Sequence, residues 1–350
     1  MPKIYKLPWT KEDNPNGWLE ITTNCQLKCP GCYRGLDKSG CYRFNEDLNE
    51  LKSQVDWFVK NRNVQTISIS GGEPLLYPHL EELVKHISSR KLYIKIYTNG
   101  LLLKESLLRR LGDLGVTEFI IHIDSMQGRK EGKKEKELNV LRREYCELFR
   151  KVGKINLGFI MPLSEINFGE LDDLMDFYIE NADVINLVVF TTYNPEITLN
   201  GNKKVKLNDI AKKIKEKYSI SPCACLGKTL SNKLSWLFFS PIIKKGKVIG
   251  EINPRIYKKL QQRYYAKRGK YFITARRKDL DFGCLMGIIG LRALKHRYAH
   301  SQTVLIIDSP SKNTKGWDLC DGCPDPIIRK GQLVPSCLLE RIKKGESIKL

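Results

Sequence analysis

Three cysteines, Cys25, Cys29 and Cys32, lie within eight positions near the start of the 350-residue chain, in the stretch TTNCQLKCPGCYRG. Thiolates at this spacing can bind metal. A structural zinc ion takes four ligands, usually from two Cys-x2-Cys pairs, whereas a thiol redox pair needs only two cysteines. Three close cysteines without a nearby fourth therefore indicate a metal site with one open position.

A second group of cysteines lies towards the C-terminus, around the segment DLCDGCPDP. It gives four thiolates for a closed site, which suits either an iron–sulfur cluster or structural zinc: Cys284, Cys320, Cys323 and Cys337. Cys223 and Cys225 either join this site or are plain thiols, and we interpret Cys41 and Cys146 as plain thiols. Because the eleven cysteines are odd in number and no signal peptide precedes them, we expect metal ligands in a reducing compartment rather than disulfides.

The elements that must position the first cysteines alternate between strand and helix. Strands are predicted at 18–23, 66–70, 93–98, 118–124, 155–162 and 184–192, and helices at 47–61, 78–89, 104–115, 133–152 and 169–181. This alternation predicts an α/β fold with a parallel sheet covered by helices. Six units are too few for a closed eight-stranded barrel, so we expect a partial (β/α)6 TIM-like barrel. Its chemistry should lie at the C-terminal strand ends, where the cysteine loop, GGEP and TNG all fall.

With these strand ends in place, the chain resembles the radical S-adenosylmethionine (SAM) superfamily over roughly residues 17–195, through its Cys-x3-Cys-x2-Cys motif, CQLKCPGC. The resemblance implies that Cys25, Cys29 and Cys32 hold three irons of a [4Fe–4S] cluster and that SAM chelates the fourth. It also implies that an electron from the cluster cleaves SAM to methionine and a 5′-deoxyadenosyl radical, which abstracts hydrogen from a substrate carbon. An external electron donor of the flavodoxin or ferredoxin type follows from the same resemblance.

The resemblance extends to three further segments at strand ends. SGGEP (70–74) matches the family motif that contacts the SAM amino group, with Glu73 as the anionic partner of an ammonium. YTNG (97–100) resembles the segment near the ribose and carboxylate, and IDS (123–125) the end of the fourth strand. The implied cofactor-binding residues are Gly71, Gly72, Glu73, Pro74, Thr98, Asn99 and Ser125. Many family members carry an aromatic residue just before the third cysteine, whereas here Gly31 precedes it and Tyr33 follows it. The sequence indicates no residue that acts on the substrate.

The C-terminal cysteines resemble the auxiliary-cluster extensions of the SPASM or twitch kind. This resemblance favours a second [4Fe–4S] cluster over zinc, although the spacing Cys-x2-Cys-x13-Cys departs from the full SPASM pattern. We therefore predict three segments: a radical SAM partial barrel over 1–195, a basic insert containing aromatic residues over 196–283, and a cysteine-rich auxiliary-cluster region over 284–350.

Much of the formal net charge of +21 is concentrated in residues 226–278, which contain fifteen Lys or Arg and only one acidic residue, Glu251. Aromatic residues are interleaved with these cations, and the run LSWLFFSPII precedes Lys244 and Lys245. This composition suits an anionic membrane surface or a lipid, with Trp236, Phe238 and Phe239 dipping into the interface. It also suits RNA, or a solvated basic face over a small core.

Three functions remain open at this point. The first is a radical SAM enzyme acting on a membrane-associated or lipid substrate, and the second is a radical SAM enzyme that modifies a peptide or protein. The third, which ranks last because it leaves GGEP unexplained, is a non-catalytic metal-cluster protein that binds nucleic acid. No apolar run is long enough to span a bilayer, so we expect a cytoplasmic protein, peripheral at the membrane under the first hypothesis.

Overall fold

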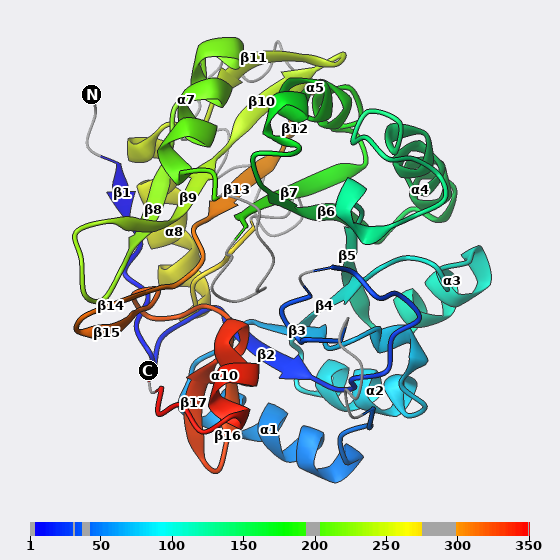
Figure 1. Ribbon diagram of the computed structural model, residues 1–350, viewed down its shortest axis with the longest axis vertical. Helices are drawn as coiled ribbons and strands as arrows, with labels where there is room; N and C mark the ends of the chain where they lie inside the picture. The colour runs from blue at the N-terminus through cyan, green and yellow to red at the C-terminus, as the bar shows by residue number, and fades with distance from the viewer. Residues whose placement is uncertain (1–3, 31, 37–42, 194–203, 275–298, 349) are drawn as a thin grey trace.

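The computed structural model describes residues 4–30, 32–36, 43–193, 204–274, 299–348 and 350. Six parallel strands form the predicted partial barrel: β2 (Asn16–Glu20), β3 (Thr66–Ser70), β4 (Tyr93–Thr98), β5 (Val116–His122), β6 (Asn156–Leu163) and β7 (Ile185–Thr192). The helices between them are α1 (Leu48–Asn61), α2 (Leu80–Ser89), α3 (Glu105–Asp113), α4 (Asn139–Val152) and α5 (Leu171–Glu180). The strands are adjacent in chain order, and Figure 1 shows these helices along the outside of the sheet.

The helix predicted over 133–152 begins later, at Asn139. The carboxylate of Glu137 accepts hydrogen bonds from the backbone N–H groups of Lys133 and Lys134, at 2.8 and 3.1 Å. These local bonds hold the preceding residues in a turn instead of a helix, as side-chain acceptors commonly do near helix starts.

The sheet continues beyond the six strands. β13 (Thr303–Ile307) pairs parallel to β7, β9 (Leu234–Phe239) pairs antiparallel to β13, and β8 (Ala224–Gly227) pairs antiparallel to β9. β1 (Tyr5–Lys6) closes the series beside β8, which makes ten strands in the order β1-β8-β9-β13-β7-β6-β5-β4-β3-β2. Strands from both segments after residue 195 thus extend the barrel sheet, and the division at 196–283 and 284–350 stays a prediction.

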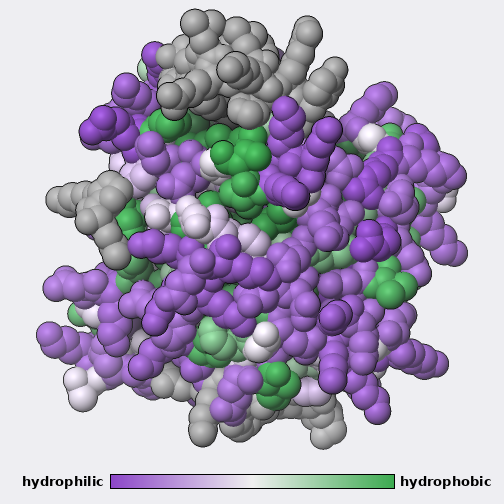
Figure 2. Space-filling model, turned by 90° about the horizontal axis from the view of Figure 1, so that it is seen from above, coloured by the Kyte–Doolittle hydropathy of each residue, from purple (hydrophilic) through white to green (hydrophobic). Residues whose placement is uncertain are grey.

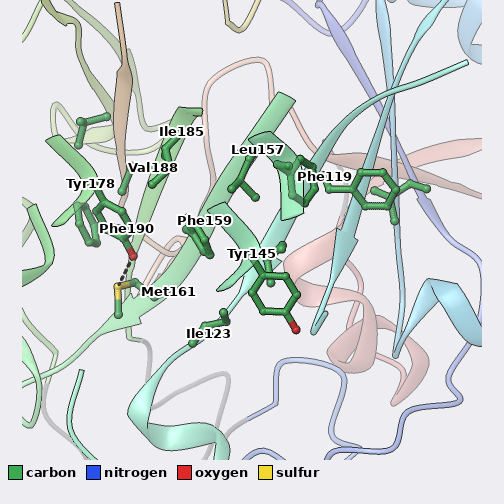
Figure 3. Close-up of a cluster of buried hydrophobic side chains, with 14 of the residues drawn as sticks. Phe119, Ile123, Tyr145, Leu157, Phe159, Met161, Tyr178, Ile185, Val188 and Phe190 are labelled. Carbon is green, nitrogen blue, oxygen red and sulfur yellow. Dashed lines mark hydrogen bonds between the residues drawn. The ribbon is translucent and has the colours of Figure 1, made fainter. Parts of the chain in front are cut away.

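Alternating side chains divide the sheet into an outer and an inner face. On the outer face, strand residues pack against the helices: Phe119 lies edge-on to Phe149 of α4, and Phe159 stacks on Tyr178 of α5. Figure 3 shows this layer, in which the Tyr178 hydroxyl donates to the Met161 sulfur at 3.7 Å. The neighbouring strand positions belong to a separate inner cluster, for example Ile120, Leu187, Val189, Leu305, Trp236 and Phe238.

The inner cluster is covered in part by α8 (Pro254–Arg268). Tyr257, Leu260 and Tyr264 of this helix are buried against the inner face, whereas its lysines and arginines are exposed. α8 therefore turns a charged face to solvent over a small core. Elsewhere the surface in Figure 2 is mostly hydrophilic, interrupted by a group of hydrophobic side chains.

The prediction that Trp236, Phe238 and Phe239 insert into a membrane interface is wrong. All three lie on β9, between β8 and β13, and at most 4% of their surface is exposed. Each buried aromatic side chain contributes about 2 kcal/mol through removal of apolar area from water, so none is available to a bilayer. Among the described residues, no helix has the length and apolar character needed to span a membrane.

Smaller elements complete the chain. β10 (Pro241–Lys244), β11 (Lys247–Glu251) and β12 (His300–Ser301) form a three-stranded sheet, and α7 (Leu207–Tyr218) precedes β8. The C-terminal tail contains the hairpins β14 (Ser311–Asn313) with β15 (Gly316–Asp318) and β16 (Pro326–Arg329) with β17 (Gln332–Pro335), followed by α10 (Leu339–Lys343). Figure 1 shows the red end of the chain beside β2, where Trp18 packs with Ile327, Val334 and Leu339.

Candidate active site

A cavity of about 360 Å³ lies against the inner face of the sheet. Apolar strand residues such as Ile160, Leu187 and Leu305 form much of its wall. Cysteines from both ends of the sequence also line it: Cys25, Cys29, Cys32, Cys320, Cys323 and Cys337. The fold therefore brings the two predicted metal-binding groups to one shared space.

The loop that carries the first three cysteines is held by the GGEP segment. Gly72 N donates to Thr22 O and Glu73 N donates to Asn24 O, both at 2.7 Å. A Cβ on Gly72 would lie 2.3 Å from Asn24 O, and one on Gly71, whose φ is +142°, would lie 2.4 Å from Thr22 O. The two glycines thus permit close approach of the cysteine loop itself, and both also line the cavity.

Glu73 makes several hydrogen bonds within the protein. Its side chain is fully buried, with Oε1 accepting from the Thr98 hydroxyl at 2.7 Å and from Leu75 N at 3.1 Å, and Oε2 accepting from Asn99 N at 2.7 Å. Burial raises the pKa of this carboxyl, and these hydrogen bonds oppose the rise. The carboxylate therefore fixes the Thr98–Asn99 turn, and its pairing with the SAM ammonium stays a prediction.

Asn99 and Thr98 line the cavity as expected. The Asn99 amide Nδ2 lies 3.8 Å from the sulfur of Cys25 and 3.1 Å from Gln26 Oε1. The backbone of this turn is held from the other side by Arg129, a buried residue that the sequence analysis missed, whose Nη2 donates to Asn99 O at 2.5 Å and His122 O at 3.0 Å.

Pro74 and Ser125 are not among the described residues that line the cavity. Pro74 begins a short 3-10 helix over Pro74–Leu76 and is buried. The Ser125 hydroxyl donates to Glu135 Oε1 at 2.8 Å, and Glu135 forms a fully buried ion pair with Arg142 at 2.6 Å. Ser125 thus belongs to a buried polar network, while the adjacent Asp124 does line the cavity.

The thiols of the first loop are half-buried. Burial, followed by the nearby charge of Asp124, raises the pKa of Cys29 to about 12, and burial also raises that of Cys25. Iron must therefore displace protons to bind here. A cubane cluster takes each thiolate on a different iron, so its ligands surround a volume and do not converge on one point.

The second cysteine loop, Cys320–Cys323, packs against the start of the chain and the end of α1. Gly322 has φ +69°, and a Cβ there would lie 2.6 Å from Trp9 O. Asn14 Nδ2 donates to Gly322 O at 3.0 Å, and Asn16 Nδ2 donates to Pro324 O at 3.2 Å. Since Asn16 is the first residue of β2, Pro324, just after this loop, lies at the N-terminal end of that strand, whereas the first cysteine loop follows its C-terminal end.

Arg62 is the main support of this second loop. Its fully buried guanidinium donates to Cys323 O at 2.5 Å, Gly322 O at 3.1 Å, Lys11 O at 2.6 Å and Asn16 O at 3.1 Å. Burial lowers its pKa to about 10, opposed by Cys323 and Asp325. Within the described part of the chain it has no carboxylate at ion-pair distance, so a positive charge stands behind the thiols, which fits an anionic cluster.

The remaining cysteines either lie outside the described residues or do not line the cavity. Cys284 and Cys41 lie outside the described residues. The Cys223 thiol donates to Phe238 O at 3.3 Å, and neither it nor Cys225 is among the residues lining the cavity, which favours plain thiols; Cys146 is buried in the outer core. Within the described ranges, no three His, Cys, Asp or Glu side chains form the ligand set of a single metal ion.

Several polar and aromatic wall residues were not found by sequence reasoning. Lys95 of β4 lies 2.8 Å from Glu118 of β5, and both are buried. A charged pair inside a barrel, where apolar side chains are usual, costs desolvation free energy and points to a binding role. In the sequence, the position of Lys95 within the otherwise apolar run YIKIYT is the feature that could have indicated this buried charge. Trp18 and Tyr97 add an aromatic wall, with ring centroids 4.6 Å apart.

The family model described as the radical SAM superfamily matches residues 19–178, which include the cysteine loop, GGEP and the strands that carry them. This part of the chain, residues 19–178, is therefore similar to a radical SAM domain. Domains of this superfamily use a [4Fe–4S] cluster and SAM, which supports these two expected cofactors, and the glycine cradle beside three thiols fits them. The auxiliary cluster stays a prediction.

Sequence relatives of the radical SAM domain are enzymes with different substrates. The chain is 25% identical to a 7,8-dihydro-6-hydroxymethylpterin dimethyltransferase of Methanocaldococcus jannaschii over 177 residues, covering 49% of this chain and 35% of the relative. It is 36% identical to PqqA peptide cyclase of Bradyrhizobium diazoefficiens over 116 residues (33% and 29%) and 26% identical to a probable GTP 3′,8-cyclase of M. jannaschii over 209 residues (57% and 65%). The chain thus spans between about a third and two thirds of these relatives.

Among solved structures, Streptococcus suis SuiB bound to precursor peptide SuiA aligns with a TM-score of 0.47 at 18% identity, covering 59% of this chain and 47% of SuiB.

Proposed function

We propose that the protein is a radical SAM enzyme that abstracts a hydrogen atom from a substrate carbon inside the shared cavity, and that its tail holds an auxiliary [4Fe–4S] cluster. When bound, the cluster on Cys25, Cys29 and Cys32 and SAM supply a 5′-deoxyadenosyl radical. The observation that carries the proposal is that both cysteine groups line one cavity.

The residues of this chain would bind and shield the reactants. Gly71, Gly72, Thr98 and Asn99 line the part of the cavity beside the first cysteine loop, where SAM would lie. The apolar inner face limits water, which protects a reactive radical from side reactions. Lys95, which also donates to the Thr274 hydroxyl at 3.2 Å, gives this apolar wall a polar group that could orient a substrate.

The first experiment tests SAM cleavage. Anaerobically reconstituted protein with dithionite and SAM should release 5′-deoxyadenosine, and replacing Cys25, Cys29 and Cys32 with Ala should abolish the release while iron bound at the tail remains. Cys146→Ala is the matched control, since this buried thiol lies in the outer core and should leave the release unchanged. Cleavage by the triple variant would contradict the assignment.

The second experiment tests the auxiliary cluster. Replacing Cys320 and Cys323 with Ala should remove about four irons per chain. Loss of one zinc with unchanged iron would assign structural zinc instead. The buried positive charge of Arg62 beside the loop supports an anionic cluster there. The prediction that Cys284 is a further ligand is tested by measuring the iron content of a Cys284→Ala variant.

The substrate class is tested by comparison of candidates. A peptide substrate is favoured by the similarity to PqqA peptide cyclase, although the match covers only 116 residues. The lipid hypothesis no longer has an aromatic membrane anchor, because Trp236 and Phe238 are buried. It retains the exposed cations of the basic stretch, among them those of α8 and Lys245 and Lys247. Flotation with anionic vesicles separates the two hypotheses, because an enzyme acting on a membrane lipid must bind the vesicles, whereas a peptide-modifying enzyme need not bind them.

Two further partners belong to the proposal. An external one-electron donor of the flavodoxin or ferredoxin type would reduce the cluster. Nucleic acid stays the lowest-ranked partner.

A further inference from the structure

Trp236 stands out among the cavity residues because its indole N–H is buried without a partner. Its side chain is 4% exposed, and Nε1 makes no hydrogen bond to any of the described residues. A buried donor without an acceptor is costly and calls for an explanation, such as a bound group that the protein carries in its working state.

The surrounding backbone brings Trp236 next to Cys320. Leu226 of β8 pairs with Trp236, and Lys228, which directly follows β8, forms a bridge with Cys320. The carbonyl of Gly227, between them, accepts from the Ser235 hydroxyl at 2.7 Å and from Asp321 N at 2.9 Å. Ser235, which precedes Trp236, and Asp321, which follows Cys320, therefore both donate to the same oxygen atom.

Both side chains also line the cavity. The sulfur of Cys320 is thus the acceptor that suits the orphaned indole once it is a metal-bound thiolate.

We propose that the Trp236 indole N–H donates a hydrogen bond to the Cys320 sulfur when the tail holds its cluster, and that this bond raises the cluster's reduction potential. The inference rests on the proposed auxiliary cluster. Reduction from [4Fe–4S]²⁺ to [4Fe–4S]⁺ adds one electron from an external reductant, moves no proton, and increases the negative charge on the cysteine sulfurs. A donor to such a sulfur stabilises the reduced state.

Trp9 provides a matched control. It is 3% exposed, its Nε1 is likewise buried without a hydrogen bond to the described residues, and its ring centroid lies 6.1 Å from that of Phe238, the same separation as for Trp236. Trp9, however, is not among the residues that line the cavity. Trp9→Phe and Trp236→Phe therefore remove the same atoms from the same aromatic layer, and only the second removes a donor from the wall of the cavity that the tail thiols line.

The experiment uses the full chain with Cys25, Cys29 and Cys32 replaced by Ala, so that only the tail cluster is observed. Spectroelectrochemical titration should give a more negative midpoint potential for Trp236→Phe, with unchanged iron content, and no shift for Trp9→Phe. Equal shifts in both variants, or no shift in Trp236→Phe, would overturn the inference while leaving the auxiliary cluster in place. Absence of tail iron in the unsubstituted background would instead overturn the proposed cluster, and the inference with it.

A second measurement covers the case in which Trp236→Phe does not fold. Protein labelled with ¹⁵N in the tryptophan indoles should show a ¹⁵N hyperfine coupling in pulsed EPR of the reduced tail cluster. This coupling should persist in Trp9→Phe. Its absence from folded, reduced protein would show that no indole N–H contacts the cluster, and would contradict the inference without any change at Trp236.

Discussion

The two cysteine loops line the same cavity but are held in different ways. The first loop is joined to GGEP by backbone hydrogen bonds between the ends of two adjacent strands, β2 and β3. The second is held by side chains that donate to its backbone, from Asn14, Asn16 and above all Arg62. The first arrangement depends on small residues that permit close approach, the second on a long buried cation. A change in one support should therefore damage one site and spare the other.

The largest expected effect comes from Arg62→Met. This change leaves several buried carbonyl oxygens without a donor, which should cost on the order of 3–5 kcal/mol in the free energy of unfolding and remove the metal bound at the tail. Arg90 is a matched control, because it occupies the equivalent C-cap position of α2, where it pairs with Asp56 at the surface. Arg90→Met should cost less than about 1 kcal/mol.

Denaturant unfolding and metal analysis measure these two effects. Tail metal retained in Arg62→Met, or equal destabilisation by both substitutions, would show that the guanidinium does not hold the second loop.

An intermediate effect is expected for Gly72→Ala. The added Cβ would lie 2.3 Å from Asn24 O, so the cysteine loop must move away from GGEP. We expect loss of the iron bound by Cys25, Cys29 and Cys32, with SAM cleavage reduced by roughly tenfold or more, equivalent to about 1.4 kcal/mol. Iron at the tail should stay.

Gly169→Ala is the control for that substitution, since nothing lies within 4 Å of its Cβ and its backbone is unstrained. Full iron occupancy and SAM cleavage in Gly72→Ala would mean that the close contact between the two segments is not required.

The smallest effect is expected for Glu340→Gln, where the two regions meet. Arg34, just after the first cysteines, is buried between Glu20 and Glu340 of α10, with Nε 3.1 Å from Glu340 Oε1. Glu340→Gln removes the partly exposed partner and should cost at most about 1 kcal/mol. Glu20→Gln should cost more, about 3 kcal/mol or above, because Glu20 also accepts from Trp18 Nε1 and the Tyr33 hydroxyl, each at 2.8 Å.

Thermal unfolding of these two variants tests whether the regions are coupled. A Glu340→Gln variant that loses metal from both loops would show that the tail helix supports the first loop strongly, and the two sites could no longer be regarded as independent.

The sequence by itself determined the barrel and predicted the first metal site. Periodicity marks each strand and helix because it reflects local geometry, and CQLKCPGC and GGEP lie at the ends of strands that are neighbours in both chain and sheet. The same kind of local pattern led to a wrong prediction at LSWLFFSPII, which we expected to be exposed at a membrane interface. Its first six residues form strand β9 of the sheet. Its burial comes from β13, which lies far along the chain.

Only the tertiary structure decided which side chains meet. It placed both cysteine groups in one cavity, set Glu73 behind the Thr98–Asn99 turn, and set Arg62 behind the second loop. These contacts join residues that no sequence period or spacing relates, because a side chain finds its partner through the packing of whole elements. Local patterns fix the elements, whereas the roles of charged residues depend on which elements become neighbours.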